Sequence, residues 1–105
     1  MMKIGFVQFE PLFGEVDRNL ERAGELIRGS DADLLVLPEL FNTGYVFTSK
    51  EEAISLSEQV PQGRTTQGLC EVAKKKGVFI VAGLAEKDGD RIFNSSVLVL
   101  SLIHI

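Results

Sequence analysis

The carboxylate of Glu39 is the side chain of this sequence best suited to acid–base chemistry. It follows Pro38 and the almost wholly apolar residues 33–37, and no basic residue lies near it in the sequence. Because the residues before it are apolar, we expect this carboxylate to be dry, and burial makes a carboxylate a better general base. Catalytic groups in α/β folds also usually lie where strands end. The alternative is a glutamate that only caps the turn after a strand. The local sequence leaves both interpretations open.

The other reactive residue types have simpler interpretations. Cys70, the only cysteine, lies in a segment with the pattern of a helix interior, which favours a semi-buried and unreactive thiol. Lys74, Lys75 and Lys76 lie at the expected C-terminal end of that helix, where cations are favourable. We assign no role to His104, the only histidine. No set of Cys and His residues has the spacing of metal ligands, so we expect no metal site.

The first third of the chain has the pattern of a strand, a helix and a second strand. Residues 3–9 are rich in β-favouring side chains and predict the first strand. Apolar residues then recur every three or four positions over residues 16–27, which predicts a helix that Asp17 caps and Gly29 ends. Residues 33–37 are the second predicted strand, and its apolar character is typical of a sheet covered on both faces.

Two further helices are predicted after the loop that follows Glu39. Ser49 and Glu52 have the spacing of a capping box, which opens a short helix. Thr65 or Thr66 is then expected to cap a longer helix, and Gly77 to end it.

Residues 78–100 have the pattern of a β-hairpin. Residues 78–84 and 91–100 are strongly β-favouring, and the Asp88-Gly89 pair between them is a turn signal. The order of elements is thus strand, helix, strand, helices, strand, strand, which predicts an α/β fold. A chain of this kind leaves an unpaired strand edge and a bare apolar sheet face, so it looks unfinished.

Composition and net charge argue against some classes of partner and location. The 105 residues suit one small domain, and 45% hydrophobic with 25% charged residues is ordinary globular composition. The formal net charge of −4 argues against a nucleic-acid partner. A single cysteine favours a reducing compartment, so we expect a cytoplasmic location. The apolar run before Glu10 is too short for a signal peptide or a membrane span, so no membrane partner is expected.

Four blocks of the sequence occur in a specific order. They are the opening strand Ile4-Gly-Phe-Val-Gln-Phe; Asn19; Leu35-Val-Leu-Pro-Glu-Leu-Phe with Thr43-Gly44-Tyr45; and Val81-Ala-Gly with Phe93-Asn94-Ser95-Ser96. Together they resemble the N-terminal part of the nitrilase superfamily, the carbon–nitrogen hydrolases that include aliphatic amidases, carbamoyl-amine hydrolases and nitrilases. The resemblance covers nearly all of residues 3–100 and is more specific than the Pro-Glu block alone.

The resemblance implies a four-layer αββα sandwich, of which residues 1–105 would form the N-terminal part, and a catalytic triad of Glu, Lys and Cys. Glu39 matches the glutamate, the general base that takes the thiol proton before attack on an amide or nitrile carbon and later activates water. Tyr45 is expected to line the substrate pocket, whereas Phe41 is at least as suited to the core. Asn94 is expected to satisfy backbone groups near the site.

The lysine and cysteine of the triad would lie beyond residue 105. The resemblance therefore implies a homo-oligomeric parent that hydrolyses a small amide, carbamoyl amine or nitrile without a cofactor, and a 105-residue chain that is inactive alone. Residues 101–105 fit the family poorly, so we expect a reading frame that is cut or shifted near residue 101. The alternative is a non-catalytic α/β binding or dimerisation module that has kept the fold and lost the chemistry.

Overall fold

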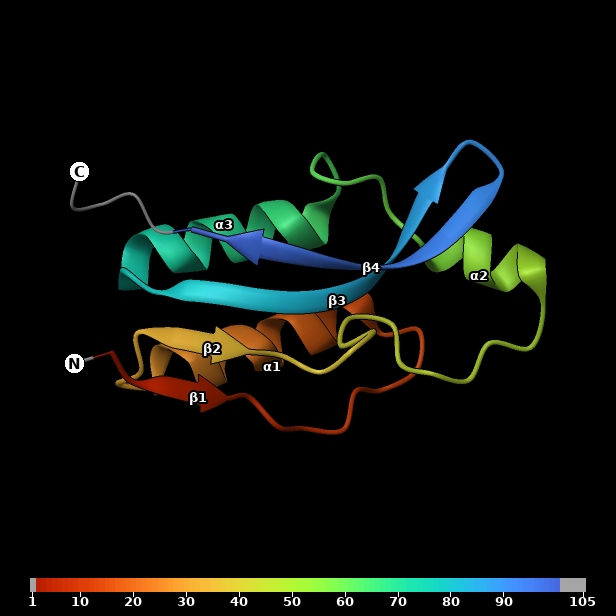
Figure 1. Ribbon diagram of the computed structural model, residues 1–105. Helices are drawn as coiled ribbons and strands as arrows, with labels where there is room; N and C mark the ends of the chain where they lie inside the picture. The colour runs from red at the N-terminus through yellow and green to blue at the C-terminus, as the bar shows by residue number, and fades with distance from the viewer. Residues whose placement is uncertain (1, 101–105) are drawn as a thin grey trace.

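A four-stranded sheet forms the centre of the protein, whose computed structural model describes residues 2–100. The strands lie in the order of the sequence, the first three parallel and the last antiparallel to the third (Figure 1). They are β1 (Ile4–Phe6), β2 (Leu34–Val36), β3 (Phe79–Asp88) and β4 (Arg91–Val99). The α/β fold class expected from the sequence is confirmed.

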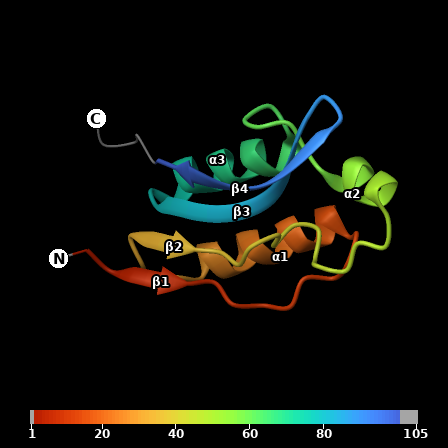
Figure 2. The ribbon, with the colours of Figure 1, turned by 45° about the vertical axis from the view of Figure 1, so that its right-hand side comes forward.

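Two of the three helices cover one face of this sheet. The helix α1 (Val16–Arg28) connects β1 to β2, and α2 (Lys50–Leu56) and α3 (Arg64–Lys76) connect β2 to β3. In both views α1 and α3 lie on the same side of the strands, whereas α2 lies near the turn end of the β3–β4 hairpin (Figure 2). Parallel strands need such crossover connections, so the helices follow from the sheet order.

The hydrophobic core lies between the sheet and these two helices. Alternate strand residues point into it because successive side chains of a strand face opposite sides. Its fully buried side chains include Ile27 of α1, Leu69 of α3, Leu35 of β2, and Ile80 and Leu84 of β3.

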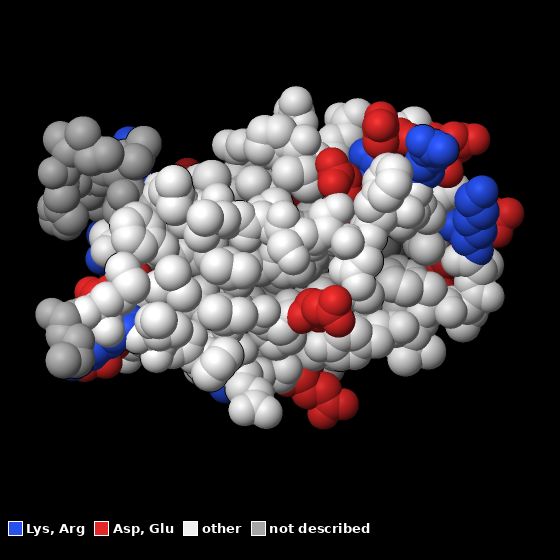
Figure 3. Space-filling view, in the orientation of Figure 1, with Lys and Arg blue, Asp and Glu red and all other residues white. Residues whose placement is uncertain are grey.

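Within residues 2–100, the opposite face of the sheet carries no helix and is apolar. Phe6 is 80% exposed, and Ile4 and Leu98 also stand free on this side. Figure 3 shows this face: charged side chains gather around the hairpin end, while most of the surface over the strands is uncharged. A bare apolar face of this kind is typical of a surface that another layer covers.

The ends of α1 agree only in part with the expected signals. Gly29 is the C-cap, as predicted. The N-cap is Glu15 and not Asp17, and its side chain makes no capping hydrogen bond. Asp17 lies in the first turn instead, where a negative charge is favourable, and its carboxylate pairs with Arg64 at 2.8 Å. The prediction for Asp17 as the cap was therefore wrong.

The predicted capping box of α2 is confirmed, because Ser49 Oγ accepts a hydrogen bond from the Glu52 N–H at 3.1 Å. The predicted cap of α3 was wrong. Its N-cap is Gly63, and both Thr65 and Thr66 lie buried inside the first turns. Thr65 does accept and donate hydrogen bonds, but its partners lie outside the helix.

The predicted C-terminus of α3 is confirmed at Gly77. This residue has a φ of 76°, a left-handed conformation that glycine adopts without strain. The basic residues 74–76 occupy the last turn, as expected.

The predicted hairpin is confirmed, and its first strand is longer than predicted. Pairing with β4 extends β3 as far as Asp88, which lies opposite Arg91. The connecting residues are Gly89 and Asp90, one position later than predicted, because Gly89 takes the positive φ of 64°. The first strand is shorter than residues 3–9, since β2 offers it only three paired positions. The expected break near residue 101, and His104, lie outside the described residues.

Candidate active site

Glu39 lies in the turn after β2, on the uncovered face of the sheet. The chain stays paired with β3 up to Leu37, whose N–H donates to the Val81 carbonyl at 2.8 Å. It then crosses over Gly83 of β3, where an added Cβ would lie only 3.0 Å from the Glu39 Cα. Because Gly83 alternates with the core residues Ala82 and Leu84, its missing side chain would point to the uncovered face. Glu39 occupies the space that this glycine leaves.

Asn94 is the hydrogen-bond partner of the Glu39 carboxylate. Its Nδ2 donates to Glu39 Oε1 at 3.2 Å. The hairpin register explains the contact, because β4 pairs Asn94 with Ala85 and Ser96 with Gly83. The structure therefore brings together residues that are 55 positions apart. Asn94 was expected to bind backbone groups, and this expectation was wrong.

Glu39 is exposed, which contradicts the expected dry setting. The apolar residues before it do enter the core, but the turn carries Glu39 itself onto the face that no helix covers. Neither a salt bridge nor a hydrogen bond joins its carboxylate to a lysine or a cysteine of residues 2–100. Asn94 holds one carboxylate oxygen, and no hydrogen bond within residues 2–100 reaches the other.

The turn after Glu39 is strained and firmly anchored. Leu40 has a φ of 49°, a left-handed conformation that costs a non-glycine residue about 1–2 kcal/mol. Its carbonyl accepts from the Gly44 N–H at 2.9 Å. Phe41, Asn42 and Thr43 follow it and are fully buried. Strain of this kind persists only where the surroundings hold it, and Phe41 contributes by filling the core.

A buried polar network holds Asn42. Its Nδ2 donates to Thr65 Oγ1 at 3.0 Å and to Glu58 Oε2 at 3.2 Å. Glu58 Oε1 in turn accepts from the Thr65 N–H at 2.8 Å. The backbone of Glu58 is fixed to β3, since its N–H donates to the Ala85 carbonyl at 3.0 Å. The turn of Glu39 is thus tied to both α3 and β3.

Sequence reasoning missed this network. The sequence shows only that a glycine, Gly63, follows Glu58 by five positions. The structure explains this glycine, because a Cβ there would lie 2.5 Å from Glu58 Oε1. The glycine makes room for the carboxylate, but nothing local identifies Asn42 and Thr65 as its partners.

Asn19 anchors the same turn from the other side. Its Nδ2 donates to the Asn42 carbonyl at 2.9 Å and to the Leu12 carbonyl at 2.8 Å, and its Oδ1 accepts from the Leu12 N–H at 2.8 Å. The loop after β1 and the turn after β2 are therefore joined through one buried amide. Asn19 belongs to the structure that positions Glu39.

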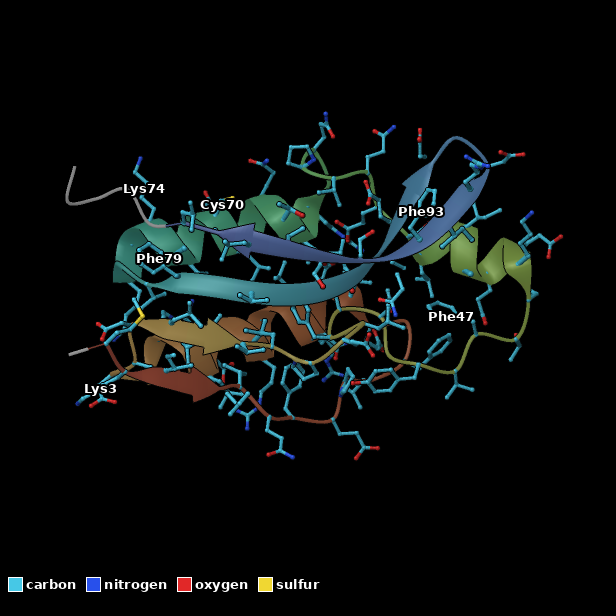
Figure 4. The ribbon with its side chains drawn as sticks, in the orientation of Figure 1. Lys3, Phe47, Cys70, Lys74, Phe79 and Phe93 are labelled. Carbon is cyan, nitrogen blue, oxygen red and sulfur yellow. The ribbon has the colours of Figure 1, made fainter. Side chains whose placement is uncertain are left out.

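Tyr45 follows the buried turn directly after Gly44, which has a positive φ, and is 53% exposed. The loop beyond it is held by Phe47, whose ring packs edge-on against Phe13 at a centroid distance of 5.5 Å (Figure 4). No hydrogen bond among the described residues involves the Tyr45 side chain. Its expected role in substrate binding stays a prediction.

Cys70 and Lys74 lie on α3, on the covered side of the sheet (Figure 4). Glu39 lies on the other side of the sheet from α3. Cys70 is exposed and not semi-buried as expected, because its position on the helix turns away from the core.

Lys3 and Asp31 form an exposed ion pair in which each charge stabilises the other. A hydrogen bond of 3.0 Å and charge attraction raise the pKa of Lys3 and lower the pKa of Asp31. Within residues 2–100, no three acidic, histidine or cysteine side chains cluster closely enough to hold a metal ion. In the same part of the chain, the helices are too short or too polar to cross a membrane.

The sequence matches known carbon–nitrogen hydrolases over almost its whole length. The family model "Carbon-nitrogen hydrolase" matches residues 3–101. A nitrilase from Pyrococcus abyssi (strain GE5 / Orsay) is 47% identical over 102 residues, which are 94% of this chain and 39% of that protein. An (R)-stereoselective amidase from a Pseudomonas species is 36% identical over 100 residues, which are 93% of this chain and 35% of that protein. The chain thus spans 35–39% of the length of these curated relatives.

The fold also matches a solved structure. The crystal structure of Saccharomyces cerevisiae Nit3, a member of branch 10 of the nitrilase superfamily, superposes with a TM-score of 0.77 at 28% identity. The match covers 94% of this chain and 40% of that one. The α/β arrangement of β1 to β4 and their helices is therefore a nitrilase-type fold.

Proposed function

Since this chain belongs to the carbon–nitrogen hydrolase family of the nitrilase superfamily, we propose that Glu39 is the general base of an amidase- or nitrilase-like reaction. The observation that carries this proposal is the placement of its carboxylate. Glu39 stands on the uncovered sheet face, on a turn that a buried network anchors, with one oxygen held by Asn94. A base must be fixed in position while keeping an oxygen free for the proton.

The proposed reaction uses Glu39 twice. Its free oxygen takes the proton of a cysteine thiol, and the thiolate attacks the carbon of a small amide, carbamoyl amine or nitrile. A lysine stabilises the negative charge of the intermediate. With an amide, the proton passes to the leaving amine, and Glu39 then takes a proton from the water that hydrolyses the thioester.

We propose that the lysine and the cysteine come from a longer polypeptide of which residues 1–105 form the N-terminal part. Cys70 is unsuited to the role of the nucleophile because it lies on α3, on the side of the sheet opposite to Glu39. The match to only 39% of the Pyrococcus nitrilase supports a longer parent. The apolar face that carries Phe6 would receive the second sheet of an αββα sandwich. Homo-oligomer formation, a cytoplasmic location and independence from cofactors stay predictions.

The test compares the 105-residue chain with the product of the complete reading frame that contains it. Ammonia release is measured on a panel of small amides, carbamoyl amines and nitriles. We expect the complete product to hydrolyse at least one class, and Glu39→Gln to lower its kcat by about 10²- to 10⁴-fold. The matched control is Glu10→Gln, which removes the charge of another exposed glutamate.

We expect no ammonia release from the 105-residue chain, because a base without a nucleophile has nothing to activate. Release that depends on Glu39 in this short chain, or full activity of Glu39→Gln in the complete product, would contradict the proposal.

A further inference from the structure

We propose that Asn94 is a positioning residue that decides which oxygen of Glu39 acts as the base. Its amide holds Oε1 and leaves Oε2 to accept the proton. This role rests on the proposed function of Glu39, and it concerns a residue with no part in the triad of Glu, Lys and Cys.

The hydrogen bond between Asn94 and Glu39 is specific to one carboxylate oxygen. Asn94 Nδ2 lies 3.2 Å from Oε1. Within residues 2–100, no second hydrogen bond reaches the carboxylate. A glutamate side chain has three rotatable bonds, and an exposed one samples several rotamers unless a partner selects among them. Asn94 is the partner that the described structure provides.

The sheet delivers Asn94 to this place by register. On β4, Val97 and Val99 are buried against the helices, whereas Asn94 and Leu98 face the uncovered side. Asn94 therefore shares the face of Glu39. The absence of a side chain at Gly83 lets the turn lie directly on β3, so the carboxylate reaches β4. A two-residue shift of the hairpin register would remove the contact.

The chemistry of an amide suits this role. A lysine or arginine in place of Asn94 would add a charged donor to Oε1, stabilise the ionised carboxylate strongly and weaken it as a base. A neutral amide directs one oxygen with a smaller effect on proton affinity, because hydrogen bonds from charged donors are about twice as strong. Asn94 can thus orient Glu39 and keep it reactive.

The first experiment is a double-mutant cycle in the complete reading-frame product. We expect Asn94→Ala to lower kcat by about 10- to 100-fold, because misplacing a catalytic group by roughly 1 Å costs about that much. KM should stay within about twofold, since Asn94 acts through Glu39. In a Glu39→Gln background, Asn94→Ala should have no further effect.

The matched control is Ser96→Ala, on the same strand and the same face, which should leave kcat unchanged. Ser96 makes no side-chain hydrogen bond in the described part of the chain. Urea unfolding of each variant checks that Asn94→Ala remains folded. An Asn94→Ala enzyme as active as the control, or an equal loss in the Glu39→Gln background, would overturn the role of Asn94 and leave Glu39 as the base. Full activity of Glu39→Gln would overturn both.

A second experiment needs no substrate. In ¹⁵N-labelled protein, the Asn94 side-chain amide signals should shift when Glu39→Ala removes the acceptor, and should stay in place when Glu71→Gln removes the charge of an exposed glutamate on α3. Unchanged Asn94 signals in Glu39→Ala would show that the contact is absent, and the proposal would fall whatever the substrate.

Discussion

Replacing Gly83 with alanine tests whether the close approach of β3 positions the carboxylate of Glu39. The new Cβ would lie 3.0 Å from the Glu39 Cα, 3.5 Å from its Cγ and 3.6 Å from its Cβ. The nearest of these atoms belongs to the backbone, so it cannot swing aside as a flexible side-chain end can. The turn of Glu39 must move away from the strand.

Two opposing effects set the expected change in the free energy of unfolding. Alanine is favoured over glycine inside a strand by roughly 0.5–1 kcal/mol. Overpacking at a tight contact costs about 1–3 kcal/mol. The clash is with a turn that Asn42 and Phe41 already fix in the interior, so we expect the cost to win and Gly83→Ala to lose about 1–2 kcal/mol.

The effect on activity should be larger than the effect on stability. Displacement of the turn moves Glu39 away from Asn94, and a shift approaching 1 Å costs on the order of 10²-fold in rate. Urea unfolding and ammonia release, both on the complete reading-frame product, measure the two quantities separately. Gly5→Ala is the matched control, because its new Cβ would make a similarly close contact, 3.2 Å from Leu35 Cδ2, on the core face of the sheet and not beside Glu39.

The reasoning fails if Gly83→Ala is as active and as stable as the unchanged protein. It also fails if Gly5→Ala loses as much activity as Gly83→Ala, since a general effect of glycine replacement in the sheet would then explain both.

Three further predictions concern the anchoring network and the uncovered face. Glu58→Ala should lower the free energy of unfolding by about 2–4 kcal/mol, because it removes the acceptor of the Thr65 N–H and one of the two acceptors of the buried Asn42 amide. In urea unfolding Glu58→Gln should lose less, and equal losses would contradict a hydrogen-bonding role. Phe6→Lys should reduce aggregation of the 105-residue chain in light scattering, because Phe6 is 80% exposed there. In the complete product, where we propose that a second sheet covers Phe6, the same substitution should lower the free energy of unfolding by about 3–5 kcal/mol. A complete product that Phe6→Lys does not destabilise would argue against that sheet. On heating, the 105-residue chain should aggregate or show no cooperative transition, whereas a cooperative transition of a soluble monomer or dimer would favour a non-catalytic module.

Local patterns in the sequence predicted most of the fold. The spacing of apolar residues identified α1 correctly, and the β-favouring runs on each side of Gly89 identified the hairpin. These features depend on neighbours within a few positions, so periodicity and turn residues are sufficient to predict them. The caps at Asp17 and Thr65 were predicted wrongly, because Arg64 and Asn42, distant in sequence, engage those side chains instead.

The surroundings of Glu39 could not be predicted in this way. An apolar segment before it suggested burial, yet the structure exposes it because the chain crosses onto the face that lacks a helix. Which face a turn enters depends on the next strand, and here on Gly83, which is 44 positions later in the sequence.

The sequence by itself determined that a single carboxylate, Glu39, follows a buried strand in an α/β chain of the carbon–nitrogen hydrolase family. Only the tertiary structure decided how that carboxylate is held: by Asn94 from β4, above Gly83 of β3, on a turn tied to Glu58. The physical reason is that residue types and short-range spacing specify elements, whereas contacts across a sheet depend on strand order and register. Those are settled only when all the strands pack together.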